Sequence, residues 1–160
     1  MRYFLIDKVT ELEPGRRARG VKNVTLSDEV LHDHFPDYPV MPGALIVEAA
    51  SQLAGFLLEM SLNKPGEPPG RALLTQIELA KFHEAAGPGD RIEIEVRLDS
   101  VLGSAAQVTA AATVGDRRIA RAALTFVMRQ IDSQRVHEQR NYVYRLWTRD
   151  LKPPPTFPWS

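Results

Sequence analysis

Four residues in the first third of the chain have types and spacings that could serve acid–base chemistry. His34 lies in the segment "HDHFPDYPVMPG", which three prolines stiffen, and Gly43 ends that segment. Glu48 and Gln52 follow four residues apart, so on a helix their side chains share one face. The set consists of an imidazole, an acid, an amide and a backbone N–H group.

An apolar helix predicted over residues 44–58 positions the acid and the amide. Glu48 is the only charged residue in that stretch, and a lone carboxylate among aliphatic side chains is costly unless something pairs with it. Pro42 and Gly43 stand at the helix start, where free N–H groups and the positive end of the helix dipole gather. Because Gly43 lacks a side chain, a ligand oxygen can approach its N–H closely.

The second half of the chain predicts an antiparallel sheet. Apolar residues alternate over 91–98, 106–114 and 118–128, with a hairpin turn at Gly115 and Asp116. The apolar face of this sheet must be covered, and the helix is apolar enough to be buried on all sides. The pattern favours an α+β fold in which a strongly curved sheet wraps around one central helix. A second copy of the sheet edge, supplied by a partner chain, would complete the burial.

Three further features flank these elements. Ser27 is a candidate helix cap, and residues 63–71 form a loop rich in Pro and Gly. Residues 131–160 are expected to be an extension of a domain that spans 1–130. Helical propensity over 133–151 precedes a proline-rich tail, and we expect this helix to pack across a subunit boundary. Its predicted apolar set is Val136, Tyr142, Val143, Leu146 and Trp147.

Bulk composition excludes several classes of function. The 160 residues include 20 basic and 20 acidic ones and no cysteine. Balanced charge argues against nucleic acid as a main partner, and the missing cysteines exclude disulfides and thiolate metal sites. The apolar helix is too short for a membrane span and carries Glu48 and Gln52 at its centre. A cytoplasmic location is expected. His32 and His34 alone do not make a metal site, so no metal or cofactor is predicted.

The segment "HFPDYPVMPGALIVEAASQ" resembles the signature of the 3-hydroxyacyl-[acyl-carrier-protein] dehydratases of type II fatty-acid synthesis. That signature is H-F-P-x-x-P-x-x-P-G-x-L-x-x-E-A-x-x-Q, and every fixed position matches. The resemblance covers roughly residues 4–129. It implies a hot-dog fold and an assembly of dimers or trimers of dimers, with each site shared between two subunits. It places the catalytic histidine at His34, the acid at Glu48, a water- or acid-orienting amide at Gln52 and the oxyanion donor at Gly43.

Dehydration of a 3-hydroxyacyl thioester explains these residue types. An imidazole removes the proton at C2 near neutral pH, and the N–H of Gly43 stabilises charge on the thioester oxygen. Apolar burial favours the neutral form of Glu48, which then donates its proton to the departing hydroxyl group. This role accounts for a carboxyl group in the middle of an apolar helix.

Some positions depart from the family pattern and keep alternatives open. Asp33 stands where family members usually have glycine, and His83 and Glu84 stand where two arginines are common. The substrate is expected on acyl carrier protein or on coenzyme A, and the basic cluster at residues 16–22 is either a docking surface for the carrier or a solvated strand face. The alternatives are a hot-dog acyl thioesterase and a non-catalytic acyl-binding or scaffolding subunit.

Overall fold

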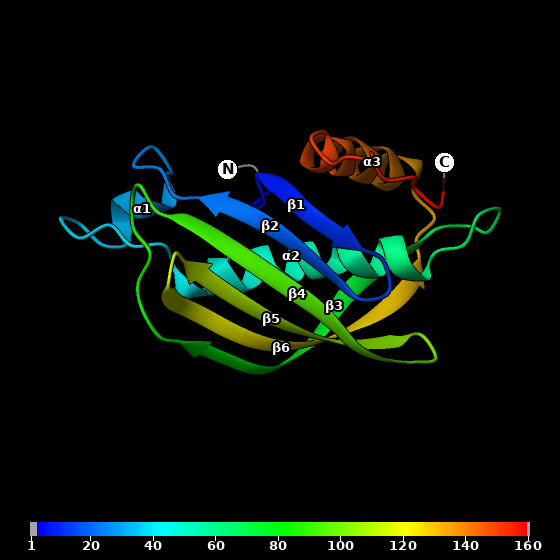
Figure 1. Cartoon of the computed structure of the whole chain (residues 1–160), viewed down its shortest axis with the longest axis horizontal. Helices are drawn as coiled ribbons and strands as arrows, with labels where there is room; N and C mark the ends of the chain where they lie inside the picture. Colours follow the sequence, from blue (N-terminus) through cyan, green and yellow to red (C-terminus); the bar gives the residue numbers. More distant parts are fainter. Residues whose placement is uncertain (1–2, 160) are drawn as a thin grey trace.

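The computed structural model describes residues 3–159, in which a six-stranded antiparallel sheet curves around one long helix (Figure 1). The strand order is β1-β2-β4-β5-β6-β3, so β1 and β3 form the two edges. The strands are β1 Lys8–Glu13, β2 Arg17–Asn23, β3 Gly70–Phe82, β4 Arg91–Leu102, β5 Ala105–Val114 and β6 Arg117–Gln130. The helices are α1 Val30–Asp33, α2 Gly43–Leu62 and α3 Gln134–Thr148. This arrangement confirms the predicted α+β fold.

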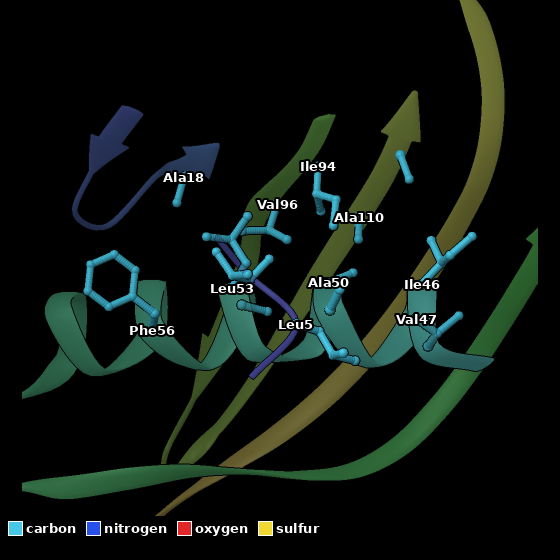
Figure 2. Close-up of a cluster of buried hydrophobic side chains, with 14 of the residues drawn as sticks. Leu5, Ala18, Ile46, Val47, Ala50, Leu53, Phe56, Ile94, Val96 and Ala110 are labelled. Atoms are coloured by element: carbon cyan, nitrogen blue, oxygen red, sulfur yellow. The ribbon is translucent and has the colours of Figure 1, made fainter. Parts of the chain in front are cut away.

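The meander β4-β5-β6 has the predicted apolar face. Ile94, Val96 and Ala110 are buried, and Figure 2 shows them on the side of the sheet that faces Ala50 and Leu53 of α2. The turn between β5 and β6 falls at Gly115, whose φ of 55° lies in the left-handed region that glycine adopts easily. Leu98, Val114 and Met128, also expected to point inward, are half-buried and pack against the same core.

Helix α2 is longer than predicted. It runs from Gly43 to Leu62 instead of residues 44–58, so it includes a second carboxylate, Glu59. By length and composition it could span a membrane, but 67% of its most apolar window is buried inside the fold. The helix is therefore the core around which the sheet closes, and the prediction ended too early because Glu59 interrupts the apolar pattern.

One strand was not predicted, and one predicted helix cap was wrong. The loop predicted over 63–71 extends to residue 69, where strand β3, which the sequence did not reveal, follows it. Most of β3 is exposed and carries no clean alternation, because it is an edge strand in this chain. Ser27 does not cap a helix: α1 begins at Val30, and the Ser27 hydroxyl contacts Thr25 instead.

Helix α3 packs beside β1 and over the C-terminal half of α2 (Figure 1). Its start is capped by Ser133, whose hydroxyl accepts a hydrogen bond from the N–H of Val136. Of the predicted apolar set, Val143 and Trp147 are buried within the chain, whereas Tyr142 and Leu146 are exposed. The buried tyrosine, Tyr144, was not predicted; it shares a helical face with Trp147. Packing of Tyr142 and Leu146 across a subunit boundary stays a prediction.

Buried polar contacts join α3 to the sheet and to α2. Glu59 forms an ion pair of 2.7 Å with Arg71, with both side chains 2% exposed, and also accepts a hydrogen bond of 2.8 Å from the hydroxyl of Tyr144. Arg71 in turn donates to Nδ1 of His137 and lies 5.1 Å from the ring centre of Trp159. Burial, followed by the nearby Glu59 carboxylate, raises the pKa of Tyr144 well above its ordinary value. The phenol therefore stays neutral and remains a donor.

Tyr144→Phe is expected to destabilise the chain by about 1–3 kcal/mol, because a buried carboxylate loses one of its donors. Tyr142→Phe is the matched control: it removes the same hydroxyl group from an exposed residue two positions away, and its effect should stay within about 0.5 kcal/mol. Urea unfolding of the full chain measures both. Equal stability of the two variants would contradict the structural role assigned to Tyr144.

Candidate functional site

His34 lies in the loop between α1 and α2 and is half-buried. Its Nδ1 is 2.9 Å from the carbonyl oxygen of Val40, and its ring stacks on Phe35 with 4.1 Å between centroids. A carbonyl oxygen only accepts, so Nδ1 carries the proton, and in the neutral ring Nε2 is left with a lone pair. The loop is anchored beyond this point, where the N–H of Met41 donates to Ala86. The imidazole is therefore oriented as a base.

Gly43 is the first residue of α2, directly after the N-cap residue Pro42. The first hydrogen bonds of the helix are donated by Leu45 and Ile46 to the carbonyl of Pro42, so helix geometry leaves the N–H of Gly43 without an intrahelical acceptor. The ring of Phe82 lies so close that a Cβ at position 43 would come within 2.7 Å of it. A side chain at position 43 would therefore displace the exposed ring of Phe82.

Glu48 and Gln52 lie on one face of α2, as their spacing predicted. The amide nitrogen of Gln52 donates to Oε1 of Glu48 at 3.0 Å and to the carbonyl of Tyr3 at 3.0 Å. The amide oxygen of Gln52 accepts from the N–H of Leu5, also at 3.0 Å. Gln52 therefore ties the N-terminal segment to the helix and fixes one oxygen of Glu48, which leaves the other oxygen of that carboxyl group available.

A hollow of about 200 Å³ extends from Glu48 along α2. Its walls come from α2, β3, β6 and α3. The residues that line it are Glu48, Ser51, Gln52, Gly55, Glu59, Ala72, Leu73, Leu74, Phe126, Arg140 and Tyr144. The hollow thus begins at the predicted acid, passes aliphatic and aromatic side chains, and ends at polar groups of α3.

Within one chain, the four predicted site residues are not all brought together. Glu48 and Gln52 are hydrogen-bonded to each other and line the hollow. His34, which is held by Val40, and Gly43, at the start of α2, are not among the residues that line it.

Sequence reasoning missed two polar residues, Glu59 and Arg140, which line the far end of the hollow. Glu59 follows Glu48, Gln52 and Gly55 at helical spacing, and this periodicity could have revealed it. Arg140 comes from a helix more than forty residues beyond β3 in the chain, and no spacing within α2 points to it.

The remaining polar clusters have ordinary explanations. No group of three metal-ligating side chains lies together anywhere in residues 3–159. Arg17 and Arg19 form ion pairs with Glu95 across the sheet. Asp33 is exposed, and Glu84 lies 3.6 Å from Arg117.

Comparison with known proteins decides the family. Residues 1–123 match the FabA-like domain family. The chain belongs to the FabA-like family. It is 39% identical over 126 residues to the 3-hydroxyacyl-[acyl-carrier-protein] dehydratase FabZ of Thermoanaerobacter sp. (strain X514), covering 79% of this chain and 87% of that protein. It is 40% identical over 127 residues to FabZ of Bacillus cereus (strain AH820), covering 79% and 85%. The predicted resemblance to these dehydratases, and the enzyme class that it implied, are confirmed.

A solved structure supports the fold of this FabA-like protein. A hot-dog-like protein from Thermanaerovibrio acidaminovorans aligns with a TM-score of 0.58 and 21% identity, over 88% of this chain and 93% of that one. The predicted hot-dog fold is thereby confirmed. The family match ends before β6 does, so α3 and the proline-rich tail lie outside it.

Gln52→Met should weaken the junction between α2 and the N-terminal segment, because it removes the partners of Tyr3, Leu5 and Glu48 while keeping a side chain of similar length. We expect a loss of about 1–2 kcal/mol and faster hydrogen exchange at the N–H of Leu5. Gln139→Met, on the exposed face of α3, is the matched control. Unchanged exchange at Leu5 would show that the amide does not hold this segment.

Proposed function

We propose that this protein dehydrates (3R)-3-hydroxyacyl-carrier-protein thioesters to trans-2-enoyl thioesters and water, in cytoplasmic fatty-acid or related acyl-chain biosynthesis. One observation carries the proposal: Glu48, with one oxygen fixed by Gln52, lines a hollow whose middle is apolar. Such a hollow suits an acyl chain with its reacting carbons at the Glu48 end. The dehydratase names of the relatives that are about 40% identical support the same reaction.

His34 is the base in this reaction. Its Nδ1–H is engaged by the carbonyl of Val40, and Nε2 takes the proton from C2 of the substrate. As that proton leaves, charge develops on the thioester oxygen. The N–H of Gly43 and the positive end of the α2 dipole stabilise this charge, and a donor in such a position typically contributes roughly 3 kcal/mol.

Glu48 is the acid. The oxygen that does not accept from Gln52 carries a proton and donates it to the hydroxyl group on C3. The C3–O bond breaks, water leaves, and the electrons of the broken C2–H bond form the C2–C3 double bond. The proton held by His34 then returns to Glu48, which restores both groups for the next turnover.

The active assembly is a homodimer or a trimer of such dimers, in which His34 of one subunit faces Glu48 of another. The separate contacts of these two residues within one chain support a shared site. Strand β3 supports the mode of association, because it is an exposed sheet edge with large apolar side chains that are 36–53% exposed. They are Leu73, Leu74, Ile77 and Phe82. Pairing with a second copy would cover this edge.

Carrier protein is the delivery form of the substrate, with coenzyme A as the other candidate carrier. Lys81 of β3 and Arg121 of β6 pair directly across the sheet, and both are exposed. Like charges in register are unfavourable for the sheet, so this pair supports contact with an acidic partner. It lies beside Phe82, whose ring covers Gly43, and so near the start of α2.

The reaction is tested by the absorbance of the conjugated enoyl product formed from a 3-hydroxybutyryl thioester. His34→Ala and Glu48→Gln should each lower kcat by at least about a hundredfold, because each removes a proton-transfer group. His32→Ala is the matched control: the residue is exposed, lies two positions away, and its loss should leave turnover unchanged.

Three outcomes would reject this mechanism. Undiminished turnover in the His34 or Glu48 variant would exclude that residue from catalysis. Release of free thiol without an enoyl signal would identify a thioesterase. Binding of the thioester without any turnover would identify an acyl-binding subunit.

Association through β3 is tested by Ile77→Glu. A charge on the apolar edge should convert the oligomer to monomers and abolish turnover, because each site would lose the residue that the second subunit contributes. Val101→Glu places the same charge on another exposed strand residue, near the tip of the β4–β5 hairpin, and should preserve both assembly and rate. Sedimentation velocity gives the assembly state. An Ile77→Glu protein that remains oligomeric would place the interface elsewhere.

A further inference from the structure

The far end of the hollow is built by α3, outside the part of the chain that the family match covers. Arg140 and Tyr144 are its two contributions, one helical turn apart. Their helix is held rigidly, because Tyr144 donates to the buried Glu59 and His137 accepts from the buried Arg71. Nε2 of His137 lies 2.8 Å from the carbonyl of Ile131, which fixes the start of the helix as well. Arg140 is therefore presented to the hollow by a fixed scaffold.

Positive charge is in excess at this end. Arg71 already neutralises Glu59 through the buried ion pair, and Arg140 lies close enough to Tyr144 to act on it electrostatically. Within residues 3–159, Arg140 forms no ion pair with a carboxylate, although the side chain is half-buried. This end of the hollow therefore has two guanidinium groups, of Arg71 and Arg140, and one carboxylate, of Glu59. The second of them lines an open space instead of meeting a protein partner.

The hollow is apolar between its two ends. Leu73, Leu74 and Phe126 line this stretch. The missing side chain of Gly55 leaves space beside Ala72, because a Cβ at position 55 would lie in van der Waals contact with Ala72, at 3.8 Å. Glu48 and Glu59 are separated by about 16 Å along the helix axis, from a rise of about 1.5 Å per residue. A ligand that fills the space would be polar at both ends and aliphatic in the middle.

We propose that Arg140 is a specificity-determining residue that selects acyl chains ending in a carboxylate. This inference rests on the proposed dehydratase function, because it places the 3-hydroxyacyl thioester end of the substrate at Glu48. The carboxylate end then reaches Arg140, whose planar guanidinium group offers paired donors to two oxygens. In the opposite orientation the terminal carboxylate would lie at Glu48, which would repel it when ionised. The substrate hydroxyl group would then lie far from Glu48, the residue that protonates it.

An ordinary methyl-ended chain fits this end poorly. Its terminus would remove water from Arg140 without supplying an acceptor, and an uncompensated charge is costly to desolvate. A carboxylate replaces that water with charge-assisted hydrogen bonds, which typically contribute enough to raise affinity about tenfold or more. The difference between the two termini is therefore measurable as a ratio of dissociation constants.

The experiment measures binding separately from turnover. Saturated acyl-pantetheine thioesters of graded length, ending either in methyl or in carboxylate, are titrated into the full-length protein by calorimetry. These probes carry no hydroxyl group and cannot be dehydrated. At the length that spans the hollow, the carboxylate should lower Kd by about tenfold or more relative to methyl. Arg140→Gln should remove this gain, and Arg145→Gln, an exposed arginine on the same helix, should keep it.

The outcomes distinguish the two proposals. Four results would each overturn the role of Arg140. They are equal affinity for both termini at every length, weaker binding of the carboxylate, no binding of either probe, and a gain in affinity that survives in Arg140→Gln. A gain in affinity that depends on Arg140 would support the carboxylate site. If the corresponding 3-hydroxyacyl thioesters were nevertheless not dehydrated, only the dehydratase proposal would be rejected. Dehydration of methyl-ended substrates only would uphold the reaction and overturn the specificity.

Discussion

The need to cover α2 on every side is the constraint on which the rest of the structure depends. A helix that is apolar around most of its circumference is stable in water only when other elements surround it. The curved sheet covers the face formed by residues such as Ala50 and Leu53 (Figure 2). The segment at Tyr3–Leu5 covers the turn near Gln52, and α3 covers the C-terminal half. What these elements leave open is the hollow beside β3.

Helix α2 carries two carboxylates, Glu48 and Glu59, whose surroundings differ. Glu59 is almost fully buried and is satisfied by Arg71, by Tyr144 and by the N–H of Ala72, so it has no free capacity for a ligand. Removing a partner from such a buried ion pair typically costs about 3–5 kcal/mol. Glu48 is half-buried and accepts one hydrogen bond, from Gln52. Glu59 is thus fully paired, whereas Glu48 keeps one oxygen for the catalytic role proposed for it.

Sequence patterns were sufficient for the parts of the fold that repeat regularly. The alternation in β4, β5 and β6 specified which side chains enter the core, and the spacing of Glu48 and Gln52 placed them on one helical face. Strand β3 could not be found in this way, because its exposed edge has no buried face to impose alternation. The partnership of Glu59 with Arg71 was missed for a related reason: helical spacing places Glu59 on the face of Glu48, but no local periodicity encodes a contact between a helix end and a strand start.

The C-terminal helix α3 supplies Arg140 and Tyr144 to one end of the hollow, while Gln52 of α2 holds Glu48 at the other. Its packing surface is mainly aromatic, with Tyr144 and Trp147 against Phe56 of α2, and its polar contacts are made to groups that are already buried. An extension held in this way can supply a new side chain at the far end of the hollow while the signature residues remain at the other. In the proposals made above, reaction type and chain selectivity are therefore assigned to opposite ends of the hollow.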